Sequence, residues 1–153
     1  MAVSQLSQQQ YDFLKEACEK AGIKLTHQRL EIFREAVNSP DHPSVETMHK
    51  RLKERMPTLA LDTVYRTLAT LAELGVVRKL NLTGRQSFFD ANLKAHHHFI
   101  CERCGLIEDI YWPEFDNSAL PGVLEKVGRV QARHLELHGT CRKCLGEAKE
   151  ERK

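Results

Sequence analysis

The 153-residue sequence lacks any long run of apolar residues, any internal repeat and any low-complexity tract. No stretch approaches the roughly 18–20 consecutive apolar residues that span a bilayer, which excludes a transmembrane protein. The first residues also lack a basic segment followed by an apolar one, so we expect no secretory signal and a cytoplasmic location. Hydrophobic residues make up 41% and charged residues 29%, which fits a soluble globular protein and excludes a disordered chain.

The sequence also has little excess of either charge, with 23 Lys and Arg against 21 Asp and Glu. A net charge of +2 with neutral histidines is too small to indicate a nucleic-acid partner by itself. The length allows one domain or two small ones. The unusual content is eight histidines and five cysteines, and in a reducing compartment grouped cysteines bind metal more often than they form disulfides.

Four of the five cysteines form two Cys-x-x-Cys pairs, Cys101/Cys104 and Cys141/Cys144. Two such pairs supply the four thiolates of a closed tetrahedral zinc site. The alternatives are a redox dithiol or two surface turns that happen to contain cysteine. We favour structural zinc because the two pairs match. Cys18 lies among apolar residues at helical spacing and is interpreted as a small buried side chain.

The first half of the chain reads as helices followed by a β-hairpin. Apolar periodicity and capping residues predict helices from residue 7 to 21, from Thr26 to Val37, from Ser44 to before Pro57, and from about Leu61 to Leu74. Residues 76–82 and 86–90 then flank Thr83-Gly84, a hairpin signal. Helices followed directly by a hairpin predict a winged helix-turn-helix domain over residues 1–90, in which the helix before the hairpin enters the DNA major groove.

That helix carries polar side chains suited to DNA. Hydroxyl groups bond phosphate oxygens, and arginine bonds phosphate or guanine. The alternative is an ordinary solvated helix face, which the helix order and the hairpin make less favourable. The residues predicted to contact DNA, including two basic ones from earlier in the chain, are Thr63, Tyr65, Arg66, Thr67, Lys24 and Arg29.

The pattern changes after Asp90. Residues 91–95 are predicted to be a connector, residues 96–145 a small α/β domain and residues 146–153 a charged tail. Within this domain we expect strands at Phe99-Ile100, 106–111 and 130–137, and a helix over 116–127. The predicted fold class is therefore α+β.

A histidine triplet, His96-His97-His98, directly precedes the first cysteine pair. In an extended chain His96 and His98 share one face, and two imidazoles on one face suit a transition metal. Asp90 and Asp109 are nearby carboxylates. The triplet alone leaves open a chance surface composition.

Several motifs together resemble the ferric uptake regulator family of bacterial metal-dependent repressors over nearly the whole chain. They are the stretches 22–29, His42-Pro43, 62–68, 75–77, 96–105 and 134–144. The resemblance implies a DNA-binding winged helix, a C-terminal α/β dimerisation domain and a homodimer that binds double-stranded operator DNA. It also implies a regulatory metal site, which on this sequence is His42, Asp90, His96, His98 and Asp109.

Both carboxylates of that set are aspartates, which resembles the peroxide-sensing branch of the family. In that branch Fe(II) reacts with hydrogen peroxide, a ligand histidine is oxidised and repression is relieved, whereas Mn(II) does not run this chemistry readily. The alternative is a regulator of the same family that reads iron, zinc or manganese sufficiency. A metalloenzyme is disfavoured, because the chain shows no HExxH helix and no nucleophile elbow.

The sequence departs from the family pattern at His27, which replaces a proline at the start of a helix, and at two further places. Ala60 stands where a small capping residue is usual, so we expect Thr58 or Asp62 to cap the helix instead. Arg133 stands where some members have a histidine of an additional metal site. His97, Glu114, His134 and His138 are therefore only weak candidates for such a site.

Overall fold

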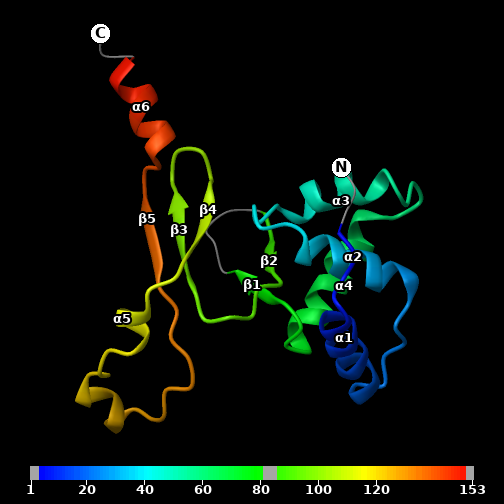
Figure 1. Ribbon diagram of the computed structural model, residues 1–153, viewed down its shortest axis with the longest axis horizontal. Helices are drawn as coiled ribbons and strands as arrows, with labels where there is room; N and C mark the ends of the chain where they lie inside the picture. Colours follow the sequence, from blue (N-terminus) through cyan, green and yellow to red (C-terminus); the bar gives the residue numbers. More distant parts are fainter. Residues whose placement is uncertain (1–3, 81–85, 151–153) are drawn as a thin grey trace. The chain divides into compact units, whose positions relative to one another are not determined.

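The computed structural model describes residues 4–80 and 86–150. The chain divides into two compact units, with the boundary between Leu93 and Lys94. The first unit contains four helices and a two-stranded hairpin, and the second a three-stranded sheet with short helices (Figure 1). The α+β class predicted from the sequence is confirmed. None of the described helices is long and apolar enough to cross a membrane.

The helices of the first unit follow the predicted order. They are α1 (Gln8–Lys20), α2 (His27–Val37), α3 (Val45–Lys53) and α4 (Leu61–Glu73). The side-chain oxygens of Ser7, Thr26 and Ser44 accept hydrogen bonds from backbone N–H groups in the first turns of α1, α2 and α3. These caps satisfy donors that a helix leaves unpaired in its first turn, which explains why the three helices begin where they do.

Helix α4 begins without a side-chain cap. Ala60 occupies the N-cap position, and no side chain accepts a hydrogen bond there. The prediction that Thr58 or Asp62 caps this helix is wrong. Asp62 lies in the first turn, where its charge favours the helix dipole, and its carboxylate pairs with Arg66 at 2.9 Å.

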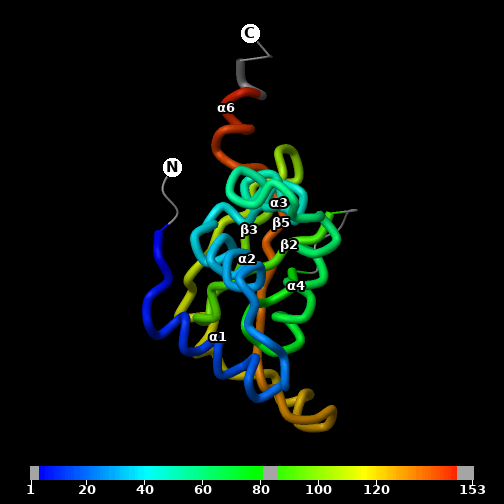
Figure 2. Tube along the Cα trace, turned by 90° about the vertical axis from the view of Figure 1, so that its right-hand side faces the viewer, coloured from blue at the N-terminus to red at the C-terminus, as the bar shows by residue number. Residues whose placement is uncertain are grey.

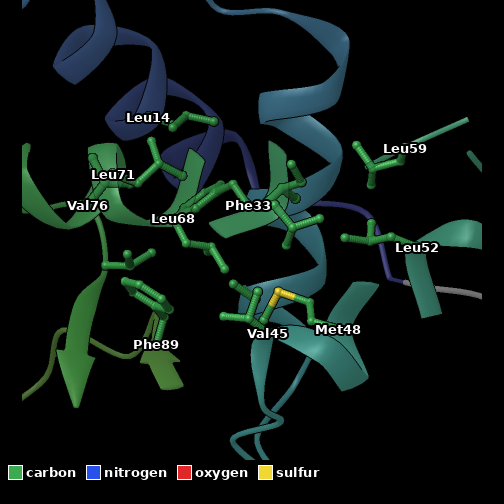
Figure 3. Close-up of a cluster of buried hydrophobic side chains, with 14 of the residues drawn as sticks. Leu14, Phe33, Val45, Met48, Leu52, Leu59, Leu68, Leu71, Val76 and Phe89 are labelled. Carbon is green, nitrogen blue, oxygen red and sulfur yellow. The ribbon is translucent and has the colours of Figure 1, made fainter. Parts of the chain in front are cut away.

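Every helix of the first unit contributes to one hydrophobic core. Leu14, Phe33, Met48 and Leu68 come from α1 to α4 in turn, and Phe89 comes from the hairpin (Figure 3). Figure 2 shows the trace of the same four helices, α1 to α4, turned by 90° from the view of Figure 1. Cys18 belongs to the same core, as its spacing predicted.

The hairpin consists of β1 (Arg78–Leu80) and β2 (Phe88–Asp90), paired antiparallel with Lys79 opposite Phe89. The predicted turn at Thr83-Gly84 lies outside the described residues. The N–H of Val45 donates to the carbonyl of Ser87 at 3.0 Å, which ties the start of α3 to β2. Four helices and this hairpin form the predicted winged helix.

The second unit is built around β3 (His97–Cys101), the central strand of its sheet. β3 pairs antiparallel with β4 (Ile107–Ile110) and parallel with β5 (Glu136–Gly139). Gly139 lies against Phe99, and a Cβ at this position would come within 3.3 Å of the phenyl ring. The remaining elements are α5 (Pro113–Asp116), the 3-10 helix η1 (Gly122–Lys126) and α6 (Arg142–Glu150).

The predicted helix over residues 116–127 is wrong. The chain forms one helical turn before this range, in α5, and a 3-10 helix within it, in η1. Pro121 disfavours helical geometry at the residue before it, and Gly122 follows at once. Val123 and Val127 are exposed, so a longer helix would have no apolar face to bury here.

Two further expectations for the second unit are corrected. The predicted strand over 130–137 starts only at Glu136, because the ladder between β3 and β5 begins with His98 opposite Glu136. The predicted tail over 146–153 is helical as far as Glu150, since α6 continues through it, and residues 151–153 lie outside the described part.

Candidate metal centres and nucleic-acid interface

The four paired cysteines converge at one end of the second unit. Cys101 ends β3, Cys104 follows in the next turn, Cys141 follows β5 and Cys144 lies in α6. All four sulfur atoms lie within 4.8 Å of one another. The Sγ atoms of Cys101 and Cys144 are 3.9 Å apart, and those of Cys104 and Cys141 are 3.7 Å apart.

These distances fit zinc. Four sulfurs at about 2.3 Å from a tetrahedral zinc ion lie about 3.8 Å from one another. The local backbone supports the cluster. Gly105 adopts φ +74° in the turn after Cys104, and the guanidinium of Arg103 donates to the carbonyl of Cys144 at 2.9 Å. The two Cys-x-x-Cys turns are therefore held together by the sheet and by α6.

The thiols of this cluster differ in acidity. The N–H of Cys141 donates to the sulfur of Cys101, and this lowers the pKa of Cys101 to about 6. Burial raises the pKa of Cys144 to about 12. A divalent ion supplies the positive charge that allows all four sulfurs to be thiolates together.

A second group of donor atoms lies in the same unit. His96 and His98 face one side of the strand, and their Nε2 atoms are 3.1 Å apart. Asp109 on β4 brings Oδ1 to 3.5 Å from the His96 Nε2 and 3.6 Å from the His98 Nε2. Ligand atoms about 2.1 Å from one ion lie roughly 3.0–3.4 Å apart, so the three atoms have the spacing of ligands to a single transition metal.

The protonation of His96 suits metal binding. Its Nδ1 lies 2.7 Å from the carbonyl oxygen of Lys94, which can only accept, so Nδ1 carries the proton. The Nε2 lone pair then points to the group of donor atoms. An outer hydrogen bond of this kind fixes the ring orientation of metal-binding histidines.

The other two predicted ligands lie together in the first unit. His42 is in the turn between α2 and α3, and Asp90 ends β2. Both are buried, and the His42 Nδ1 is 4.0 Å from the Asp90 Oδ1. The N–H of Asn92 donates to that same oxygen at 2.8 Å and orients the carboxylate.

The predicted DNA-contacting residues of α4 do not share one environment. Tyr65 and Arg66 are exposed, and Thr63 is partly exposed. Thr67 is buried at 8% exposure, so its predicted place on the outer face of α4 is wrong. It follows Val64 by three residues and therefore turns toward the core.

Other basic residues border this face. The Lys79 Nζ lies over the Tyr65 ring, 5.7 Å from its centroid, and the same ring packs edge-on against Phe89. Lys24 is exposed, whereas the Arg29 guanidinium donates to the carbonyl of Lys24. Arg29 therefore braces the segment before α2 as well as adding charge.

His97 faces the side of the strand opposite to His96 and His98. The N–H of Leu135 donates to its Nδ1 at 3.2 Å, which leaves the proton on Nε2. That Nε2 is 3.1 Å from the Asp116 Oδ1, although the geometry is not that of a hydrogen bond. The partner of His97 is thus Asp116. A turn formed at Pro113 is the only sequence signal that could have placed Asp116 there.

Arg133, which is positively charged, lies in the same region as His97 and Asp116. Its Nη1 donates to the carbonyls of Phe115 and Ser118 at 3.0 and 2.9 Å, and its guanidinium lies over the Phe115 ring. The guanidinium therefore closes the loop after α5 by hydrogen bonds.

A winged helix followed by a unit with two groups of metal-ligand atoms defines a metal-binding DNA-associated protein. The model of the ferric uptake regulator family matches residues 20–138. The chain belongs to the ferric uptake regulator family.

Named relatives agree with this assignment. The chain is 34% identical over 134 residues to a protein named peroxide operon regulator from Bacillus subtilis, covering 86% of this chain and 92% of the relative. It superposes on a Campylobacter jejuni peroxide stress regulator with a TM-score of 0.64 and 27% identity, covering 91% and 100% of the two chains.

The fold is also that of the Helicobacter pylori ferric uptake regulator, with a TM-score of 0.76, 21% identity and coverage of 95% and 97%. That structure is described as having three functional metal binding sites. Members of the family are transcription regulators and not enzymes, and their structures carry zinc and iron or manganese. The present chain is accordingly a metal-dependent repressor with a zinc-type four-cysteine site and a histidine-aspartate site.

Proposed function

We propose that this repressor responds to hydrogen peroxide. Its regulatory ion, Fe(II) or Mn(II), would be held by His42 and Asp90 from the first unit and by His96, His98 and Asp109 from the second. The observation that carries the proposal is the donor set, in which both carboxylates are aspartates and two buried imidazoles lie beside Asp109. The similarity to a peroxide operon regulator supports it.

The chain supplies what such a switch needs. Ligands from both units would let one ion fix the angle between the winged helix and the second unit, and so favour the DNA-competent state. An Fe(II) ion held there would supply the electron that breaks the O–O bond of hydrogen peroxide. One oxygen would leave as hydroxide and the other would add to a ring carbon of the imidazole, while the ring would return one electron to the iron and its proton to the hydroxide, which leaves as water. Oxidised His42 or His96 would be a poorer ligand, and repression would end with loss of the ion.

The same proposal covers the partners. Lys24, Arg29, Thr63, Tyr65 and Arg66 would contact double-stranded operator DNA in a cytoplasmic protein. The second unit exposes large apolar side chains that a homodimer interface would bury. They include Val123, Val127, Leu137 and Leu145, with exposures of 64%, 80%, 38% and 52%.

Tandem mass spectrometry of the Fe(II)-loaded protein after peroxide tests the proposal. Trypsin releases His42 within residues 35–50 and His96 within residues 95–103. Fragment ions are required, because the first peptide also contains Met48 and the second contains Cys101. We expect one added oxygen on His42 or His96, and none on His27, which lies in its own peptide over residues 25–29.

The Mn(II)-loaded protein is the matched control and should remain unmodified at these histidines. DNA binding measured in parallel should be lost with peroxide only in the Fe(II) form. Unmodified His42 and His96 in the Fe(II) form would reject peroxide sensing. Metal-dependent DNA binding without such oxidation would instead identify a regulator of iron, zinc or manganese sufficiency.

A further inference from the structure

The turn that carries His42 has an unusual backbone. His42 has φ +45° and is the only non-glycine residue with positive φ in the described part of the chain. Side chains with a Cβ rarely adopt this left-handed conformation. Pro43 follows directly and disfavours the right-handed helical region for His42. The conformation therefore requires support from outside the turn.

Arg51 on α3 provides that support. Its Nη1 donates to the hydroxyl of Ser39 and to the Oδ1 of Asp41, both at 3.2 Å. Its Nη2 donates to the Oδ2 of Asp41 at 2.5 Å, which makes the pair bidentate. The backbone N–H of His42 in turn donates to the Ser39 carbonyl at 3.3 Å. One guanidinium thus holds two of the three residues that precede His42.

The base of this support is rigid. Met48 and Leu52, on either side of Arg51 in α3, are almost completely buried in the core. Arg51 also lies 4.0 Å from the buried carboxylate of Glu35 on α2. Glu35 accepts a hydrogen bond from Arg55 at 2.9 Å. The turn is therefore anchored, through Arg51, to two helices of the core.

We infer that Arg51, through Asp41 and Ser39, is a positioning residue for the regulatory metal. It fixes the backbone of the turn so that the His42 imidazole is already oriented as a ligand. The inference rests on the proposed role of His42 in metal binding. It assigns to Arg51 no contact with the ion.

A positioning role differs from a general contribution to stability. The side chains of Arg51 and Asp41 are 39% and 54% exposed, and ion pairs at such exposure add little to folding stability. A bidentate pair nevertheless imposes a defined geometry. Loss of Arg51 should therefore change metal affinity much more than it changes the melting temperature.

Arg55→Met is the matched control for Arg51→Met. Arg55 lies four residues further along and pairs with Glu31 and Glu35 of α2, at 3.6 and 2.9 Å. The contacts described for it do not include the turn. Mn(II) affinity is measured by electron paramagnetic resonance on the full-length, zinc-loaded protein, and melting is followed by circular dichroism.

We expect Arg51→Met to weaken Mn(II) binding roughly 10–100-fold, as loss of supporting groups around metal ligands does, with a nearly unchanged melting temperature. Arg51→Lys should recover only part of the affinity, because an ammonium cannot form the two parallel bonds. Asp41→Asn, which keeps the size of the side chain, should weaken binding in the same direction. Arg55→Met should keep the affinity within about twofold of the wild type.

Two results would overturn the inference. The first is wild-type Mn(II) affinity in Arg51→Met and Asp41→Asn, and the second is an equal loss in Arg51→Met and Arg55→Met. His42→Ala separates this failure from that of the proposed function. If His42→Ala alone weakens binding, the positioning role fails and the ligand set survives. If His42→Ala binds Mn(II) like the wild type, the proposed ligand set fails and the inference with it.

Discussion

Removal of zinc should unfold the second unit and leave the first one folded. The first unit buries a cluster of 15 hydrophobic residues drawn from every one of its helices. The corresponding cluster in the second unit consists of Cys101, Cys141 and Cys144, with Phe99 packed against it. Three of these four residues are themselves candidate zinc ligands, so the core and the metal site are largely the same group of atoms.

The magnitude follows from this difference. Structural zinc contributes about 10–16 kcal/mol of apparent binding free energy in small zinc domains at neutral pH. A whole domain is usually stable by only about 5–15 kcal/mol. A unit whose buried cluster is made of zinc ligands should therefore be unfolded without the ion. The first unit, whose core is a cluster of hydrophobic side chains, should keep its unfolding transition.

The single tryptophan of the chain makes the assay specific. Trp112 lies in the second unit, with its ring 5.6 Å from that of Phe115, so its fluorescence reports on this unit alone. The protein is treated with a chelator under reducing conditions, and zinc loss is verified by metal analysis. We expect the Trp112 emission to shift to that of the unfolded protein while most of the helical circular dichroism remains.

Cys141→Ser should behave like the chelated protein. Cys18→Ala is the control, because it removes the one cysteine that lies outside the cluster and should keep both zinc and the native Trp112 emission. A protein shown to be free of zinc that retains native emission and melts as the wild type would refute the reasoning.

Three further predictions concern the first unit. Ala60→Ser should add the missing cap of α4 and raise the free energy of unfolding by about 1 kcal/mol in urea titrations, whereas Ala60→Val, which supplies no acceptor, should not raise it; equal effects would argue against capping. Arg66→Ala should reduce the slope of log affinity against log salt for random-sequence duplex DNA by about 0.9, and an unchanged slope would remove Arg66 from the phosphate contacts. The hydrogen bond from Arg51 lowers the pKa of Asp41 below its ordinary value of 3.8. Because both side chains are partly exposed, the resulting stabilisation is small. It is present above pH 3.8 and is lost as the pH falls through the lowered pKa, so the slight excess of the wild-type urea midpoint over that of Arg51→Met at pH 7 should disappear in acid; an excess that persists in acid would contradict this origin.

Local signals were sufficient for the helices of the first unit. Thr26 and Ser44 cap their helices as predicted, because an N-cap needs only a hydroxyl a few residues from the N–H it accepts. The cysteine cluster was equally predictable, since two matched pairs must meet to complete a tetrahedral site.

Other features depended on contacts between distant segments. The Nε2 of His49 on α3 lies 2.8 Å from the carbonyl of Leu59, ten residues further along the chain, and no local pattern predicts this contact. Arg51 reaches Asp41 across a turn, ten residues away, and no periodicity predicts such a pair. The second unit has few buried apolar residues, so the spacing of hydrophobic residues is a weak signal there. The helix over 116–127 was predicted wrongly for this reason.

The parallel pairing of β3 with β5 has a consequence for the order in which the protein matures. His98 pairs with Glu136, and the cysteine cluster is complete only with Cys144. The whole first unit therefore leaves the ribosome before β5, the parallel partner of β3, has been made. The edge of β3 that pairs with β5 stays open until residues 136–139 have been made. All four cysteines can bind one zinc ion only after Cys144 has been made, so metal capture follows the synthesis of the whole first unit.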